Sequence, residues 1–337
     1  MNQEDERRQE LGIIPRFPQV IDSSMLSAFR ACNYKAYLNY FEHWHSKYES
    51  VHLVAGGAFA KGVEVARKKF YEEGMNEVDS EAYGLQALIA NYGQFECPPE
   101  SPKSLERMSG ALEYYFSIHP LGRDGMEPIT LESGRRGIEF SFAEPLDLHH
   151  PVTLDPLLYS GRSDMIAHFA GAVFNVDEKT TTQLGAKWGG QWNLRSQFTS
   201  YGWAGRRVGI KMAGTIVRGI SILKNKYDNA QAIVYHSDWE LDRWEQLMYR
   251  QVRKMLDCWA EGLYDQDLDG SCVRAGNPFD RSTDSACNDY GGCQFREVCK
   301  AKDPYSVLEI DFARRVWDPL SHREIPIEEW EAEHYGQ

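Results

Sequence analysis

Apolar and polar positions repeat with two different periods along this chain of 337 residues. Residues 138–142 (IEFSF) alternate apolar and polar side chains, which is typical of a half-buried β-strand. Residues 162–169 and 172–179 are rich in β-favouring residues, and Ala170-Gly171 between them suits a tight turn. We therefore expect a first strand followed by a β-hairpin.

Apolar side chains at helical spacing predict several helices around these strands. The segments with this spacing are 25–38, 56–74, 79–118 with a break at a cluster of prolines, 195–223 and 242–262. A further short buried strand is predicted at 232–235. This alternation predicts an α/β protein with a small mixed sheet flanked by helices and a helical amino-terminal region.

Changes in composition divide the chain into five predicted regions. They are a flexible arm (1–20), a helical amino-terminal region (21–120), a core (121–265), a cysteine-cluster segment (266–302) and a carboxy-terminal tail (303–337). The hydrophobic content of 42% is ample for a sizeable core. The sequence has no run of about 18 apolar residues, and its charged amino terminus is unlike a signal peptide. We therefore expect a soluble cytoplasmic protein without a membrane partner.

The net charge of −13 argues against a nucleic-acid partner, but the charge is unevenly distributed. Residues 180–227 contain no Asp or Glu, and eight Lys and Arg residues are interleaved there with aromatic residues such as Trp188, Trp192 and Trp203. Cations that hold a phosphate backbone beside aromatic faces that stack on bases are typical of a DNA-binding surface. Alternatively, the aromatic residues belong to the core and the cations solvate a helix.

Four residues of the predicted hairpin suggest its chemistry. The two strands would bring Asp164 near Asp177. Asp177 and Lys179, two residues apart, share one face of their strand, and Glu178 points to the other. Two carboxylates can hold a hard cation such as Mg²⁺, and a neighbouring lysine can orient the attacking water of phosphodiester hydrolysis. The alternative interpretation is a cross-strand ion pair on a half-solvated sheet.

Gln197 and Tyr201, four residues apart on a predicted helix, complete a wider pattern. Asp164 in GRSDMI, Asp177 and Lys179 in VDEKTT, and this Q-x-x-x-Y spacing resemble the RecB-like branch of the PD-(D/E)xK nuclease superfamily. The resemblance implies that Asp164 and Asp177 bind the metal and that Lys179 is catalytic. It also implies that Gln197 and Tyr201 lie beside the active site, and the Glu178 carbonyl is a further candidate metal ligand.

The predicted helix that starts near Gly57 departs from this family at one position. RecB-like nucleases begin the helix with G-x-x-H-x-x-x-E, and aligning Gly57 and Glu64 places Ala60 where the histidine would be. Glu64 is a candidate metal ligand and catalytic residue, or else a solvated helix glutamate. His52 lies too far upstream to be identified as a substitute.

Three of the seven cysteines form a cluster, Cys287, Cys293 and Cys299, which predicts either a zinc site or an iron–sulfur cluster. The arrangement resembles that of iron–sulfur nucleases of the CRISPR-adaptation and AddB type, which take one cysteine from before the core and three from after it. By that resemblance, Cys32 joins the three as ligands of a [4Fe–4S] cluster. Zn²⁺ is the alternative cofactor, and Cys258 and Cys272 are spare candidate ligands.

Together these features predict a Mg²⁺- or Mn²⁺-dependent deoxyribonuclease, an exonuclease acting on DNA ends or single strands in recombination, repair or phage DNA metabolism. Homo-oligomers and protein partners in recombination are further expectations. One rival hypothesis is a catalytically weak or inactive DNA-binding protein of the same fold, suggested by Ala60. Another is a zinc-stabilised scaffold that binds protein rather than DNA.

Overall fold

The computed structural model describes residues 3–267, 277–282, 285–288 and 292–335. These residues divide into two compact units, which we describe separately. The central unit consists of residues 49–142 and 162–245, and the terminal unit of residues 1–48, 143–161 and 246–337. Three long elements have residues in both units. They are β4 (Ile138–His149), β5 (Pro156–Phe169) and α8 (Asp238–Asp267).

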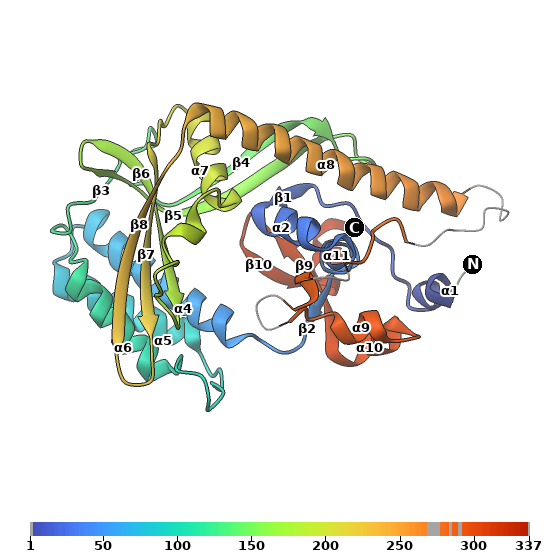
Figure 1. Ribbon diagram of the computed structural model, residues 1–337, viewed down its shortest axis with the longest axis horizontal. Coiled ribbons are helices and arrows are strands. Elements are labelled where there is room, and N and C mark those ends of the chain that lie inside the picture. Colours follow the sequence, from blue (N-terminus) through green and yellow to red (C-terminus); the bar gives the residue numbers. More distant parts are fainter. Residues whose placement is uncertain (1–2, 268–276, 283–284, 289–291, 336–337) are drawn as a thin grey trace. The chain divides into compact units, whose positions relative to one another are not determined.

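A mixed sheet forms the middle of the central unit (Figure 1). Strand β6 (Ala172–Thr181) pairs antiparallel with the second half of β5 and parallel with β7 (Gly214–Ile222). Strand β8 (Tyr227–Tyr235) continues the sheet antiparallel to β7, while β4 and the short β3 (Glu127–Pro128) pair with β5. All nine residues of β7 are buried, so β7 is the innermost of these strands.

Three helices pack together beside this sheet and contribute to one hydrophobic cluster with Ile220 and Ile222 of β7. They are α4 (Val51–Tyr71), α5 (Glu77–Tyr92) and α6 (Leu105–Ile118), and the side chains of Ser50, Asn76 and Ser104 cap their amino ends. Helices α4 and α5 meet at two glycines. A Cβ on Gly84 would lie 2.6 Å from the Gly62 carbonyl oxygen, so only glycine permits this approach.

The remaining elements of the central unit follow β6. The loop after β6 contains a short 3₁₀ helix, η1 (Gly190–Trp192), and leads to α7 (Ser196–Arg207). Lys179 of β6 lies 5.9 Å from the centre of the Phe198 ring of α7, whereas Glu178 contacts α4 and α6. Because neighbouring residues of a strand point to opposite faces, α7 and the α4–α6 group cover opposite faces of β6.

In the terminal unit, β1 (Val20–Asp22) pairs in parallel with the first part of β5, and a three-stranded sheet has the order β10 (Arg323–Pro326), β9 (Phe312–Asp318), β2 (Trp44–Ser46). Besides the second part of α8, the described residues of this unit form six α-helices and one 3₁₀ helix. They are α1 (Gln3–Glu10), α2 (Ser23–Ala31), α3 (Asn33–Tyr40), η2 (Ser285–Cys287), α9 (Arg296–Lys300), α10 (Pro304–Asp311) and α11 (Ile327–Tyr335).

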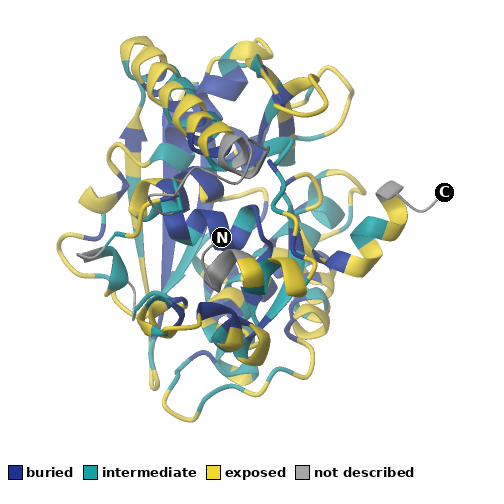
Figure 2. Cartoon of the chain, turned by 90° about the vertical axis from the view of Figure 1, so that its right-hand side faces the viewer, coloured by how far each residue is buried: buried dark blue, intermediate teal, exposed yellow. Residues whose placement is uncertain are grey.

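The burial of side chains follows these elements, with strands and inward helix faces buried and the outer helix faces exposed (Figure 2). In the terminal unit, the Phe279 ring packs between Tyr37 and Phe41, with both ring centroids 4.8 Å away. Aromatic contacts of this kind bury large apolar areas. They fix a segment near the carboxy terminus against α3.

The predicted α/β class, with a mixed sheet flanked by helices, is confirmed. The predicted helix over 195–223 is wrong in its second half, because α7 ends at Arg207 and residues 214–222 form β7. Gly209, with φ +78°, ends the helical region, and the β-branched residues of GTIVRGISI favour the strand. Within the described parts of the chain, every helix is too short or too polar to span a membrane.

Candidate active site

Asp164 and Asp177 come together at the β5–β6 pair. Met165 pairs with Val176, so Asp164 and Asp177 are the next residues on their two strands. The backbone N–H of Glu178 donates a hydrogen bond of 3.0 Å to Asp164 Oδ2. Asp177 is 1% exposed. The hairpin therefore places two carboxylates side by side in a largely buried position.

Lys179 lies on the same side of β6 as Asp177, and its Nζ is 2.6 Å from Asp177 Oδ1. Burial raises the pKa of Asp164 well above its usual value, and the charge of Asp177 raises it further. Burial likewise raises the pKa of Asp177, although Lys179 partly offsets this. For Lys179 burial acts to lower the pKa, but Asp177 and Asp164 outweigh it and raise the pKa. The lysine is therefore charged, whereas burial disfavours the ionised form of both neighbouring carboxyl groups.

This carboxylate pair fits a hard divalent cation. Asp177 Oδ1 is buried and, although it lies within ion-pair distance of Lys179, it accepts no hydrogen bond of normal geometry. Two repelling carboxylates with such an oxygen suit Mg²⁺ or Mn²⁺, which Asp164 and Asp177 would hold. When bound, the cation would polarise a phosphate and acidify a water. Across the residues that the structure describes, no three His, Cys, Asp or Glu side chains form a preassembled metal site.

Glu178 turns its carboxylate to the opposite face of β6. Arg67 Nη1 of α4 donates a hydrogen bond of 3.1 Å to Glu178 Oε2, and Tyr115 of α6 donates one of 2.9 Å to Oε1. Arg218 of β7 donates to the Tyr115 hydroxyl at 3.3 Å and forms an ion pair of 2.8 Å with Asp124. The Glu178 side chain is therefore part of a buried charge network. Only its backbone carbonyl stays a candidate ligand.

Gln197 and Tyr201 lie on α7, which covers the Lys179 face of β6. Gln197 Nε2 donates a hydrogen bond of 2.9 Å to the Tyr201 hydroxyl. Tyr201 is buried and its ring packs 6.3 Å from the Phe142 ring, edge to face. The pair therefore forms a fixed polar group on the helix next to Lys179.

Glu64 lies on α4 and is held by two lysines, with Lys68 Nζ at 2.6 Å and Lys61 Nζ at 3.0 Å. Burial acts to raise the pKa of Glu64, but the hydrogen bonds from these lysines lower it. One face of the helix carries Gly56, Ala60 and Glu64 at intervals of four residues. A Cβ on Gly56 would lie 3.9 Å from Thr180 Oγ1, so α4 passes the end of β6 with Ala60 one turn further on.

Sequence reasoning missed Glu139, which lies near the carboxylates at the start of β4. Its Oε2 is 2.9 Å from Arg162 Nε, and its backbone has φ +51°. Burial raises the pKa of Glu139 to about 7, with Arg162 lowering it and Glu64 raising it. Its charge also raises the pKa of Asp164. The regular alternation of IEFSF predicts a strand here, but nothing in that pattern indicates an electrostatic partner of Asp164.

The four cysteines of the predicted cluster lie in the terminal unit. Cys32 Sγ accepts hydrogen bonds of 3.4 Å from the backbone N–H groups of both Lys35 and Ser282. The Ser282 carbonyl in turn accepts a hydrogen bond of 3.1 Å from Cys287 Sγ. Burial raises the pKa of Cys299, and Arg281 acts against it. The other three thiols, Cys293, Cys32 and Cys287, raise the pKa further, so Cys299 interacts electrostatically with each of them.

The spare candidate Cys272 lies outside the described residues, and Cys258 is buried on α8. Cys97 belongs to the central unit, where its Sγ lies 3.5 Å from the Pro98 carbonyl oxygen. Cys32, Cys287, Cys293 and Cys299 therefore lie in one unit and interact electrostatically, but within the described residues they do not form a preassembled metal site.

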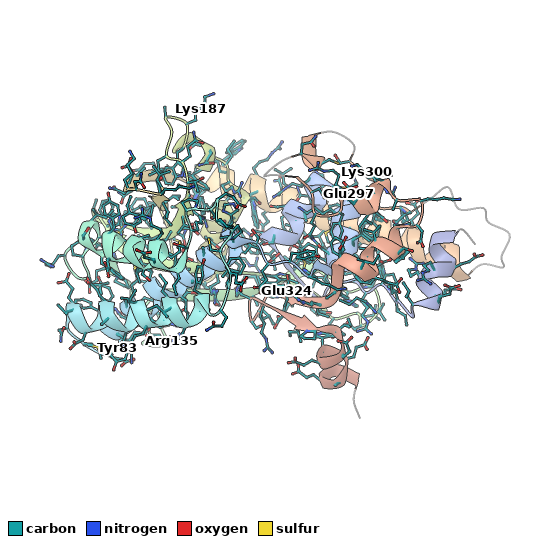
Figure 3. All side chains as sticks on the ribbon, turned by 90° about the horizontal axis from the view of Figure 1, so that it is seen from below. Tyr83, Arg135, Lys187, Glu297, Lys300 and Glu324 are labelled. Carbon is teal, nitrogen blue, oxygen red and sulfur yellow. The ribbon has the colours of Figure 1, made fainter. Side chains whose placement is uncertain are left out.

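The basic stretch over 180–227 differs from the expected stacking surface. Tyr227 is half-buried, and the other aromatic side chains of the stretch are buried, namely Trp188, Trp192, Phe198, Tyr201 and Trp203. Arg218 is buried as well, and Arg206 is 2.8 Å from Asp242. Lys187 projects from the loop after β6 (Figure 3) and is exposed. The aromatic residues therefore form core, and only the cations remain to contact a nucleic acid.

The α/β core carries an Asp-Asp-Lys arrangement on β5 and β6. The family model of the PD-(D/E)XK nuclease superfamily matches residues 23–300. The chain belongs to this superfamily, whose members usually use Mg²⁺ or Mn²⁺. No curated protein matches the chain. A solved structure described as "Crystal structure of SSO0001" is 14% identical, covering 56% of this chain and 72% of its own, with a TM-score of 0.26.

Proposed function

We propose that the protein is a Mg²⁺- or Mn²⁺-dependent deoxyribonuclease of the RecB-like branch that acts as an exonuclease. The observation that carries this proposal is the Asp164–Asp177–Lys179 arrangement, in which a buried and a half-buried carboxyl group, both with raised pKa values, lie beside a charged lysine. Membership of a nuclease superfamily supports the same reaction class. Recombination, repair or phage DNA metabolism is the process in which we place it.

Each residue of the site has a proposed task. Asp164 and Asp177 hold the cation, with Glu64 and the Glu178 carbonyl as further candidate ligands. Lys179 orients the attacking water and offsets negative charge as the phosphorus–oxygen bond breaks. Gln197 and Tyr201, which bond to each other on α7, set the position of the strand or of Lys179. The hydrolysis adds water across one phosphodiester bond and leaves a phosphate and a hydroxyl.

We further propose that Cys32, Cys287, Cys293 and Cys299 bind a [4Fe–4S] cluster, with Zn²⁺ as the alternative. The hydrogen bond from the Ser282 N–H to Cys32 Sγ, together with that from Cys287 Sγ to the Ser282 carbonyl, supports this proposal, because it links Cys32 to the segment that carries the other cysteines. The cluster would join α2 and α3 to the carboxy-terminal segment. Its proposed role is structural.

Digestion of end-labelled single- and double-stranded DNA in Mn²⁺ tests the nuclease proposal. Lys179→Ala is compared with Lys69→Ala, which removes a lysine from a surface ion pair on α4. We expect the wild type and Lys69→Ala to degrade linear DNA from its ends and Lys179→Ala to bind DNA without cleaving it. Cleavage of closed circular DNA would instead indicate an endonuclease. DNA binding without any cleavage by the wild type would favour a catalytically inactive DNA-binding protein.

A further inference from the structure

Arg162 is a cation that the proposed mechanism does not use, and it lies on β5 two residues before Asp164. Its Nε forms an ion pair of 2.9 Å with Glu139 Oε2. This side chain is 40% exposed, whereas that of Glu139 is only 11% exposed. Glu139 is the one ion-pair partner of Arg162 within the described residues, and the exposed part of the guanidinium is accessible from solvent.

Glu139 is itself held in an unusual position. Its φ of +51° lies in the left-handed region that few residues other than glycine adopt, and the surrounding fold must impose it. Its charge interacts with Glu64, Lys68 and Arg67, which all belong to α4. Strained backbone of this kind concentrates at functional sites. The fold therefore maintains a nearly buried carboxylate whose one ion-pair partner, within the described chain, is Arg162.

The charges near Asp164 show why such an arginine would matter. The carboxyl groups of Asp164 and Asp177 lie side by side here, so a cation beside them would offset the repulsion of an approaching phosphate. Lys179 lies against Asp177, and its charge is largely taken up there. A guanidinium fixed at Nε presents parallel N–H groups, a geometry that matches two oxygens of one phosphate.

We propose that Arg162 binds a backbone phosphate of the nucleic-acid substrate, adjacent to the bond that is cleaved, and that Glu139 is the positioning residue that orients its guanidinium. This inference rests on the proposed nuclease function. It adds a phosphate-binding residue, and a partner that acts through it, to the set of site residues.

Salt dependence of DNA binding tests the first half of the inference. Binding of a short duplex is measured in Ca²⁺, which slows cleavage, for the wild type, Arg162→Met, Arg162→Lys and Arg123→Met. Arg123 is the matched control, since it forms an exposed ion pair with Glu77 in the same unit. We expect Arg162→Met to reduce the slope of log K against log salt by about 0.9, the value for one phosphate contact. Arg123→Met and Arg162→Lys should keep the slope, because neither removes a cation from the phosphate.

Cleavage kinetics test the second half. We expect Glu139→Ala to raise KM with a smaller change in kcat, Glu139→Gln to restore most of the loss, and Glu139→Ala to add nothing in an Arg162→Met background. A further loss in that background would overturn the positioning role, because Glu139 would then act independently of Arg162. Melting temperatures of all variants identify any that misfold.

The outcomes separate this inference from the function on which it rests. If the wild type neither binds nor cleaves DNA, the proposed function fails. If the wild type binds and cleaves while Arg162→Met retains the wild-type salt slope and KM, the nuclease stands and the phosphate contact is refuted.

Discussion

Arg67 and Glu178 form a buried ion pair on the face of β6 opposite Asp177 and Lys179, with Arg67 Nη1 3.1 Å from Glu178 Oε2. Burial acts to raise the pKa of Glu178, but the charge of Arg67 lowers it to about 2. The pair fixes the residue between the two proposed catalytic groups. It therefore holds the orientation of the strand that carries them.

Removal of one partner of this pair should destabilise the protein strongly. We expect Arg67→Met to lower the free energy of unfolding by about 3 to 5 kcal/mol, because Glu178 would be left charged and buried. Arg123→Met, which removes an exposed ion pair with Glu77, should change it little. Urea unfolding measures both. If the double variant Arg67→Met/Glu178→Met is no more stable than Arg67→Met, the loss does not come from the uncompensated charge.

Glu139 should make stability depend on pH. Its pKa is about 7 in the folded protein and 4.5 as the ordinary value, so the folded state binds more protons between these values. Stability from this group is therefore fully present below pH 4.5 and is lost as the pH rises through 7. We expect Glu139→Gln to gain about 3 kcal/mol relative to the wild type over this interval, from the pKa difference. Denaturant titrations with EDTA present measure it, and parallel pH profiles would contradict it.

The four proposed cluster ligands, Cys32, Cys287, Cys293 and Cys299, should bind a metal cofactor, whereas Cys97 of the central unit should not. Protein purified without oxygen should absorb near 400 nm and contain iron, and Cys299→Ser should lose both properties and melt at a lower temperature. Cys97→Ser is the control, because Cys97 lies in the other unit. Stoichiometric zinc without visible absorbance would show that the alternative cofactor is the correct one. Equal metal content in Cys299→Ser and Cys97→Ser would remove Cys299 from the ligand set.

Position 60 offers a gain-of-function test. Ala60 lies on α4 one turn before Glu64. The charge of Glu64 interacts with Glu139, which in turn interacts with Asp164, so this part of α4 is directed toward the carboxylates. We expect Ala60→His to tighten Mn²⁺ binding by about tenfold or more, since even outer-shell groups have effects of that size. Ala82→His, on an exposed position of α5, should leave Mn²⁺ binding unchanged. An equal response of the two variants would show that α4 does not present residue 60 to the metal.

The sequence predicts the hairpin geometry well because it depends on local pattern. Two β-favouring segments around Ala170-Gly171 suffice to bring Asp164 next to Asp177, and strand alternation alone separates Glu178 from Lys179. The strand over 214–222 is predicted as helix because its apolar residues continue those of the preceding helix, although its β-branched residues favour a strand. Its assignment depends on parallel pairing with β6, which is a contact between distant segments.

Glu139, Arg162 and Arg67 could not be assigned from the sequence for a related reason. Each acquires its role through a partner on another element, Arg67 with Glu178 being 111 residues away. For the aromatic residues of 180–227, the sequence instead predicts a binding role that the structure does not support. Their composition is typical of a stacking surface, but only packing determines whether Trp188 or Trp203 faces a ligand or the core.

The bond from Ser282 to Cys32 spans 250 positions, and the Tyr34 N–H also donates to the Asp280 carbonyl at 3.0 Å. During synthesis, the first 48 residues emerge long before the segment to which they bond. The residues of the central unit are synthesised between residue 48 and the segment around residue 282. This unit can therefore fold before the terminal unit is complete. A chain truncated before residue 280 should therefore lack the segment that bonds to Cys32 and Tyr34. Nascent chains should depend on chaperones until residue 282 has left the ribosome.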